Sequence, residues 1–274
     1  MSTSLDIKTN FSLKRCNTFA IDAYADKFIA ISSVDELAQA LDQISSGPFL
    51  VLGGGSNLLL DQSRIHQPVL WINNKGIEVL KQTEAEVLVR AGAGENWHEL
   101  VLWSIERGFG GLENLSLIPG NVGAAPVQNI GAYGVELKDV LHQVEVMNLA
   151  TGEVELLGAE ECSLGYRDSV FKSTRRGRWI IMAVIFRLTR MHHQLRLEYG
   201  SIQNRLAQSG ISEPTIRDVS NAVIRIRQER LPDPAQLPNA GSFFKNPLVS
   251  VTQYETLKEA YPDIPCYEQP DASL

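Results

Sequence analysis

The chain has 274 residues, of which 44% are hydrophobic and 21% are charged, an ordinary composition for a soluble globular protein. Its 32 acidic and 25 basic residues give a formal net charge of −7, which disfavours nucleic acid as a partner because phosphate binding needs a basic surface. No apolar run is long enough to cross a bilayer, and the N-terminus lacks the apolar core of a signal peptide, so we expect no membrane association.

The cysteines and histidines predict neither a disulfide framework nor a metal site. Cys16, Cys162 and Cys266 lie far apart and form no CxxC pair. An odd, scattered set of this kind indicates reduced thiols in a cytoplasmic protein. The five histidines include no HExxH motif, so no metal is expected.

A strand–helix–strand unit is expected first. The capping-box pattern Ser33–Glu36 predicts the start of a helix whose apolar residues recur at helical spacing as far as Ile44. Gly47-Pro48 ends this helix, and the apolar run Phe49–Leu52 predicts a strand. The strand leads straight into the glycine-rich loop Gly53–Asn57.

More strands and a second helix are expected before residue 110. Val69–Ile72 is a further apolar run of strand length, and Ile77–Leu80 with Val87–Ala91 has the pattern of a hairpin. A second capping-box pattern, Asn96–Glu99, opens a helix that Gly108 closes.

The segment Ile118–Gly134 contains four glycines and no charged residue. Glycine permits positive φ and close approach of a ligand to the backbone, and consecutive N–H groups in such a loop form a nest that suits a pyrophosphate. Together with Gly53–Asn57 it indicates a large phosphorylated cofactor held mainly by backbone. The alternative is two tight turns without a ligand. No GxGxxG follows a strand and no GxxxxGK[ST] is present, so neither a Rossmann site nor a P-loop is supported.

The C-terminal half is expected to continue with a hairpin, a strand and a helix. Val144–Leu149 and Glu153–Leu157 flank a turn, and Trp179–Leu188 is a long apolar strand. Glu213-Pro214 starts a helix that Leu231–Pro234 breaks, at a point that resembles a domain hinge.

Several polar side chains are candidates for chemistry. Arg167 offers a bidentate fork for a carboxylate or phosphate, or else it pairs with Asp168. Ser242 follows a glycine and precedes two aromatic residues, so it is either a proton relay or a plain turn serine. Glu198–Gly200 is either the tip of a lid or a turn. Three arginines either bind phosphate or simply form a solvated helix face: Arg225, Arg227 and Arg230.

Eight segments, in order along nearly the whole chain, resemble the UDP-N-acetylenolpyruvoylglucosamine reductase (UDP-N-acetylmuramate dehydrogenase, MurB) family. They are Asn17–Phe19, Leu52–Asn57, Gly92–Trp97, Gly111–Asn114, Ile118–Gly134, Gly165–Phe171, Leu231–Pro234 and Gly241–Pro247. The resemblance implies an α+β fold, the vanillyl-alcohol-oxidase/MurB type of FAD-binding fold. It implies FAD-binding subdomains at residues 1–75 and 76–230, and the start of an incomplete, truncated substrate-binding domain at residues 231–274.

The same resemblance implies an FAD-containing, NADPH-dependent oxidoreductase. Its members reduce UDP-N-acetylglucosamine enolpyruvate to UDP-N-acetylmuramate in peptidoglycan precursor synthesis, and so serve cell wall biogenesis, cell shape and cell division. The cofactor is non-covalent FAD, and NADPH is the hydride donor. A cytoplasmic monomer follows, with this UDP-sugar as its small-molecule substrate and neither nucleic acid nor membrane as a partner.

The resemblance also assigns site residues. Arg167 polarises the substrate carboxylate and Ser242 donates a proton. Substrate-binding positions are Tyr133, Tyr166, Tyr199, Arg230, Asn246 and Tyr267, of which Tyr199 matches the lid tyrosine of one subclass. Cofactor-binding positions are Gly53, Gly54, Gly55, Ser56, Asn57, Ile118, Pro119, Gly120, Val122, Gly123, Ala124, Gln128, Asn129, Gly131, Ala132 and Ile181.

The chain departs from the family pattern in one respect. A third catalytic residue, a glutamate near the C-terminus, would lie beyond Leu274. One alternative is therefore an FAD-binding fragment without turnover. Another is an oxidase of the same flavin fold with a covalent tether, for which His66 is the nearest candidate.

Overall fold

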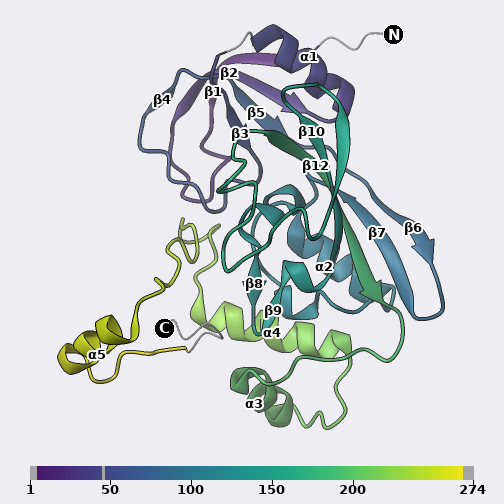
Figure 1. The fold of residues 1–274 in the computed structure, drawn as a ribbon, viewed down its shortest axis with the longest axis vertical. Coiled ribbons are helices and arrows are strands. Elements are labelled where there is room, and N and C mark those ends of the chain that lie inside the picture. Colours follow the sequence, from purple (N-terminus) through teal and green to yellow (C-terminus); the bar gives the residue numbers. More distant parts are fainter. Residues whose placement is uncertain (1–4, 45–46, 268–274) are drawn as a thin grey trace. The chain divides into compact units, whose positions relative to one another are not determined.

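The computed structural model describes residues 5–44 and 47–267, which divide into two compact units. The first unit is Met1–Gly241 and the second is Ser242–Leu274 (Figure 1). The described part of the chain contains no helix with the length and apolar character that a membrane span requires. The predicted domain boundaries after residues 75 and 230 stay predictions.

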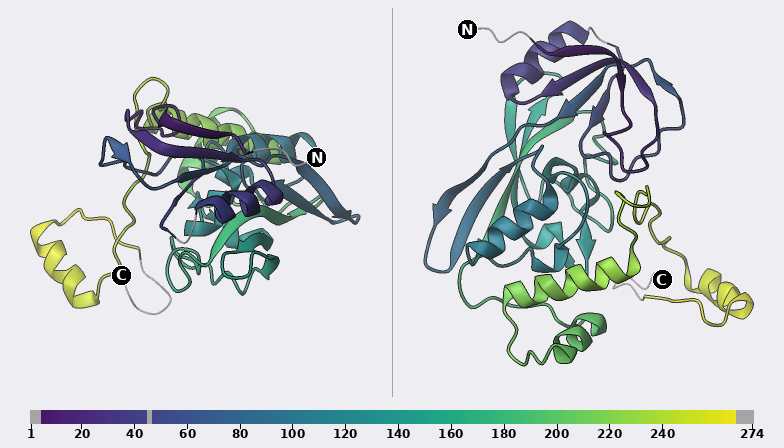
Figure 2. Two further views of the ribbon diagram at one scale, coloured as in Figure 1. Left: turned by 90° about the horizontal axis from the view of Figure 1, so that it is seen from above. Right: turned by 180° about the vertical axis from the view of Figure 1, so that it is seen from behind.

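A mixed sheet opens the first unit. β1 pairs antiparallel with β2, and β2, β5 and β3 run parallel, with β4 beside β2. The bounds are β1 Ile7–Ser12, β2 Tyr24–Ile31, β3 Leu50–Leu52, β4 Arg64–Ile65 and β5 Val69–Ile72. The helix α1 (Val34–Ile44) connects β2 to β3 and lies along this sheet (Figure 2). Its apolar stripe explains this position, because Leu37 and Ala40 are fully buried.

A second, antiparallel sheet supplies most of the core, in the order β11-β10-β12-β7-β6. The bounds are β6 Ile77–Gln82, β7 Glu86–Gly92, β10 Leu141–Asn148, β11 Val154–Gly158 and β12 Trp179–Thr189. The central strand β12 is buried almost throughout, as its long apolar run predicts. Both predicted hairpins are confirmed.

Helices pack beside this sheet. α2 (Trp97–Glu106) buries Trp97 against Phe186 of β12, with ring centroids 5.9 Å apart. α4 (Ile216–Arg230) begins after a reciprocal capping box between Thr215 and Asp218, so it starts just after the predicted Glu213-Pro214. The helix α3 (Gly200–Gln208) packs on α4 through a separate small apolar cluster.

The segment expected to be an open loop between residues 118 and 134 contains short structure. It comprises the 3-10 helices η2 (Val122–Ala124) and η3 (Pro126–Gln128) and the two-residue strand β8 (Gly131–Ala132), which pairs with β9 (Val135–Glu136). Two further 3-10 helices flank it, η1 (Glu113–Leu115) and η4 (Leu137–Asp139). The second unit contains one helix, α5 (Val251–Ala260), among its described residues.

Candidate functional site

The two glycine-rich loops lie directly against each other. Gly53–Asn57 follows β3, and Gly54 is so close to the second loop that a Cβ there would stand 2.9 Å from the Gly120 Cα and 2.8 Å from the Asn121 Oδ1. A Cβ at Gly120 would in turn stand 2.6 Å from the Ser56 Oγ. Only glycine permits this approach at residues 54 and 120.

Backbone donors gather where the loops meet. Within the described part of the chain, the N–H groups of Gly54, Gly55, Ser56, Gly120 and Asn121 have no hydrogen-bond acceptor. Such adjacent, unpaired N–H groups form a cradle for an anion. This cradle joins two loops that are more than sixty residues apart in sequence.

The rest of the second loop differs from the expected open nest. The N–H groups of Val122 and Gly123 donate to the carbonyls of Glu95 and Ala93, at 2.8 and 2.9 Å. Those of the next two residues donate within the 3-10 turns. These four amides are occupied, so within residues 120–125 only the N–H groups of Gly120 and Asn121 are left for an anion among the described contacts.

A buried hydroxyl beside the cradle supports a polar ligand. The Thr18 Oγ1 is buried and has no hydrogen-bond partner among the described residues, although most buried polar atoms have one. The backbone N–H of Thr18 donates to the Gly55 carbonyl at 3.1 Å, which places the residue against the first loop. An orphaned hydroxyl and a glycine-bounded amide cradle fit the phosphates of a flavin nucleotide.

Leu117, which precedes the second loop and has a strained backbone conformation, is fixed by hydrogen bonds to two side chains. Leu117 has φ of +58°, its N–H donates to His98 Nδ1 at 3.0 Å, and its carbonyl accepts from Arg227 Nε at 3.2 Å. Burial lowers the pKa of the His98 imidazole and that of the Arg227 guanidinium. Both polar groups of Leu117 are therefore fixed by side chains from α2 and α4.

The end of the loop is held by Asn114 and Arg227. The Asn114 Nδ2 donates to the Tyr133 carbonyl at 2.9 Å, and the Tyr133 side chain interacts electrostatically with the Arg227 guanidinium. Of the three arginines noted in the sequence, Arg227 is thus a structural contact to this loop. Arg225 and Arg230 are exposed. No pattern in the sequence distinguished Arg227, because its loop partners lie about a hundred residues away.

Asn129 fastens the loop from within. It is fully buried, its Oδ1 accepts from the Lys138 N–H at 3.0 Å, and its Nδ2 donates to Glu136 and to the Gly165 carbonyl. Its side chain is occupied by protein contacts, which favours a supporting role in the structure.

The side chain of Arg167 packs against the second glycine-rich loop. Its guanidinium donates to the carbonyls of Asn129 at 3.2 Å and Gly131 at 2.6 Å, and lies 5.6 Å from the ring centroid of Tyr166. No described carboxylate comes within 4.0 Å of it, so the alternative ion pair with Asp168 does not form. The remaining N–H groups of the guanidinium can address a ligand carboxylate.

The other predicted positions fall in three places. Tyr133 and Tyr199 are in edge contact, with ring centroids 5.8 Å apart, and Tyr199 is half exposed at the start of α3. Ile181 is buried in β12. The second unit contains Ser242, Asn246 and Tyr267, so a joint site of Ser242 with Arg167 stays a prediction.

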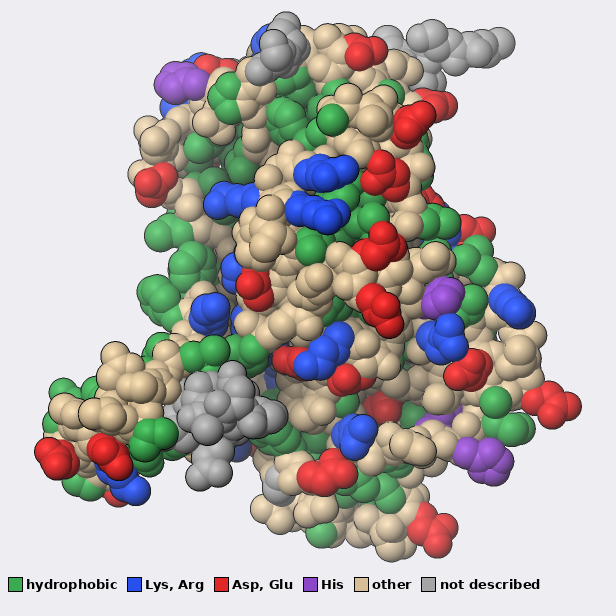
Figure 3. Space-filling model, in the orientation of Figure 1, with side chains coloured by type: hydrophobic (Ala, Val, Ile, Leu, Met, Phe, Trp, Pro, Cys, Tyr) green, Lys and Arg blue, Asp and Glu red, His purple; other side chains and the backbone are tan. Residues whose placement is uncertain are grey.

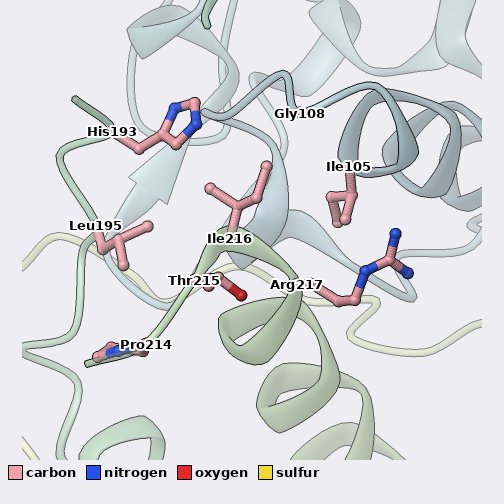
Figure 4. Close-up of a pocket in the computed structure, with 8 residues that line it drawn as sticks. All are labelled: Ile105, Gly108, His193, Leu195, Pro214, Thr215, Ile216 and Arg217. Atoms are coloured by element: carbon pink, nitrogen blue, oxygen red, sulfur yellow. The ribbon is translucent and has the colours of Figure 1, made fainter. Parts of the chain in front are cut away.

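Two further features lie apart from this arrangement. His66 is exposed and its Nδ1 lies 2.8 Å from the carboxylate of Asp26. A hollow of about 490 Å³ opens between α2 and the start of α4 (Figure 4), and it contains none of the predicted site residues. It is lined by Ile105, Gly108, His193, Leu195, Pro214, Thr215, Ile216 and Arg217.

Comparison with known proteins first defines the class. Residues 25–158 match the FAD binding domain family, and this match covers the cradle and the first sheet except for β1 and the first residue of β2. Together with the α+β fold and the reductases among its relatives, it makes the chain an FAD-containing oxidoreductase.

Relatives then define the family. The chain is 48% identical over 264 residues to the UDP-N-acetylenolpyruvoylglucosamine reductase of Flavobacterium johnsoniae, covering 96% of this chain and 78% of that protein. It is 49% identical over 273 residues to that of Pseudomonas fluorescens, covering 99% and 80%. The crystal structure of the MurB reductase of Thermus caldophilus matches with 25% identity and a TM-score of 0.61, covering 89% and 75%. The chain belongs to the UDP-N-acetylenolpyruvoylglucosamine reductase family.

Proposed function

We propose that this protein takes part in reducing UDP-N-acetylglucosamine enolpyruvate to UDP-N-acetylmuramate, an NADPH-dependent step of peptidoglycan precursor synthesis. The observation that carries the proposal is the cradle of unpaired N–H groups at residues 54–56 and 120–121, in a chain of this family. We further propose a cytoplasmic location for this reaction.

The cradle would hold the pyrophosphate of non-covalent FAD, with Thr18 beside it. Bound flavin supplies the two-electron relay between NADPH and the enolpyruvyl ether. The protein's task at this point is to bind and orient, because backbone N–H groups aimed at a phosphate need no rearrangement on binding.

Arg167 would orient the substrate carboxylate. Hydride addition at the β carbon of the enolpyruvyl group leaves an enolate-like carbanion on the substrate. A fixed cation at the carboxylate stabilises that charge. The two carbonyls that hold the Arg167 guanidinium, those of Asn129 and Gly131, supply the required rigidity.

Ser242 would complete the reaction by giving its hydroxyl proton to the α carbon. Six further side chains would contact the substrate, with Tyr199, in edge contact with Tyr133, as a lid over the nucleotide end of the substrate. They are Tyr133, Tyr166, Tyr199, Arg230, Asn246 and Tyr267.

The test is NADPH oxidation by the purified, flavin-loaded protein, with and without the enolpyruvyl substrate. We expect oxidation that depends on the substrate, and yellow colour that stays in the supernatant after denaturation. A protein that binds flavin without substrate-dependent turnover would be an FAD-binding fragment instead. Colour that remains with the denatured chain would indicate a covalent tether.

A further inference from the structure

A compact group of cations lies between β11 and β12. The basic loop, residues 172–178, contains Lys172, Arg175, Arg176 and Arg178, all of them exposed. Figure 3 shows how Lys and Arg side chains alternate with acidic ones over the face that it presents. The chain as a whole has a net charge of −7, so this concentration of positive charge opposes the overall balance.

The cations of the basic loop form no close ion pair with a described carboxylate, although the charge of Arg178 contributes to lowering the pKa of Glu155. No described carboxylate lies within 4.0 Å of any of the four, whereas Arg64, Arg90, Arg187 and Arg205 elsewhere each form an ion pair. Two acidic side chains close to the basic loop in sequence or in the sheet are occupied by other contacts. Asp168 accepts from the Ser169 N–H, and Glu155 accepts from Trp179 and Asn148.

Contacts with Trp179 and Val170 fix the conformation of the basic loop. The guanidinium groups of Arg175 and Arg178 lie 5.6 and 4.9 Å from the ring centroid of Trp179, and the Arg175 N–H donates to the Val170 carbonyl at 3.0 Å. Turn hydrogen bonds of this kind hold like charges together at an energetic cost. An exposed cluster that forms no ion pair within 4.0 Å keeps much of its field available to solutes.

The basic loop is attached to the candidate site. The Lys172 Nζ donates to the Arg167 carbonyl at 2.9 Å, and the Arg167 side chain lies on the second glycine-rich loop. Positive charge therefore begins at Arg167 and continues along the following residues. At low ionic strength the Debye length is about 30 Å, so an approaching anion experiences this charge before it makes contact.

We propose that the basic loop is an electrostatic capture surface that attracts the phosphates of nucleotide ligands toward Arg167. The proposal rests on the proposed function, in which the UDP-sugar and NADPH both carry a pyrophosphate. It concerns the association rate, because exposed charges near a cleft raise encounter rates more than they raise final affinity. The chain is acidic overall and would repel a nucleic acid, so we expect a small anion as the ligand of this loop.

The experiment compares association rates of the flavin-loaded protein with UDP and with NADPH, measured by stopped-flow fluorescence at low and high salt. The test variant is Arg175→Gln/Arg176→Gln/Arg178→Gln, which leaves Lys172 in place. The matched control is Lys81→Gln/Arg107→Gln/Arg217→Gln, three exposed cations on β6, after α2 and on α4. It changes the net charge by the same amount.

We expect the test variant to associate about tenfold more slowly at low salt, with the difference vanishing at high salt. Dissociation rates and flavin content should not change, and the control should behave like the wild type. NADPH, with its additional phosphate, should be affected more than UDP, and uridine should be unaffected.

Three outcomes would overturn the proposal. Equal slowing in both variants would show an effect of net charge alone. Unchanged rates in the test variant would exclude capture by this loop. Loop-dependent binding of single-stranded DNA or phosphatidylglycerol vesicles, without an effect on nucleotides, would assign the surface to another partner. Binding rates require no turnover, so failure of the proposed reaction would show only in the NADPH oxidation assay.

Discussion

At the scale of single residues, Gly54 sets the distance between the two glycine-rich loops. In Gly54→Ala the new Cβ would meet the Gly120 backbone at 2.9 Å, where no flexible side chain can give way. Overpacking of this kind costs roughly 1–3 kcal/mol. We expect lower flavin content after purification and a lower thermal midpoint. Gly47→Ala is the control, because nothing lies within 4 Å of its Cβ position. Equal flavin content in the two variants would show that the cradle does not bind the cofactor.

His98 should make stability depend on pH. Burial lowers its pKa from the ordinary 6.5, with Arg227 adding to this effect and Glu99 opposing it. As pH falls below 6.5, the unfolded chain takes up a proton before the folded chain does, so the free energy of unfolding decreases until the lowered folded pKa is reached. Protonation also removes the Nδ1 acceptor of the Leu117 N–H.

The corresponding variant is His98→Gln, which does not titrate. Urea unfolding at about pH 7 and about pH 5.5 should show a smaller loss of stability in this variant than in the wild type. His192→Asn, at an exposed histidine, is the control and should lose as much as the wild type. An identical loss in all three proteins would mean that His98 is not responsible.

Ser242 is predicted to act in only one half of the reaction. In Ser242→Ala, reduction of the flavin by NADPH should continue at nearly the normal rate, because no proton from this serine is needed. Reoxidation by the enolpyruvyl substrate should slow by about a hundred- to ten-thousand-fold, the usual contribution of a positioned proton donor. Stopped-flow measurement of each half-reaction separates the two. Reoxidation at the wild-type rate would remove Ser242 from the mechanism.

At the scale of elements, local patterns predicted the parts whose partners are close in sequence. The hairpins β6–β7 and β10–β11 have period-2 apolar residues and a turn between them, and α1 and α2 have caps and an apolar face. The first strand of the expected strand–helix–strand unit, β2, was not located in the sequence. Its polar pair Asp26-Lys27 interrupts the apolar run, and its strand character comes from pairing with β1 and with the distant β5.

The helices α3 and α5 were also not predicted. α3 begins at Gly200, where the sequence was compatible with either a lid or a turn. Its apolar residues Ile202 and Leu206 are buried only because α4 packs on them. Glycine content did indicate where the two loops lie. It could not show which N–H groups stay unpaired, because the carbonyls that occupy the other amides, those of Ala93 and Glu95, lie in the distant turn between β7 and α2.

At the scale of the whole molecule, the two units differ in how much apolar surface they bury. α5, in the second unit, has no buried residue, and Phe244 is 90% exposed. A helix of ten residues without a packed face is marginal in water, and its capping box at Ser250 adds only about 1 kcal/mol. α2 has the same length but buries five of its side chains in the core.

We therefore expect amide hydrogens of α5 to exchange far faster than those of α2 in the flavin-loaded protein. Limited proteolysis should cut first within Ser242–Leu274, and the remaining Met1–Gly241 unit should keep its flavin, because both glycine-rich loops precede residue 135. Hydrogen exchange by mass spectrometry and the absorbance of the trimmed protein test these two statements. Protection of α5 equal to that of α2 would reveal a surface that covers it. Loss of flavin on trimming would show that the second unit contributes to cofactor binding.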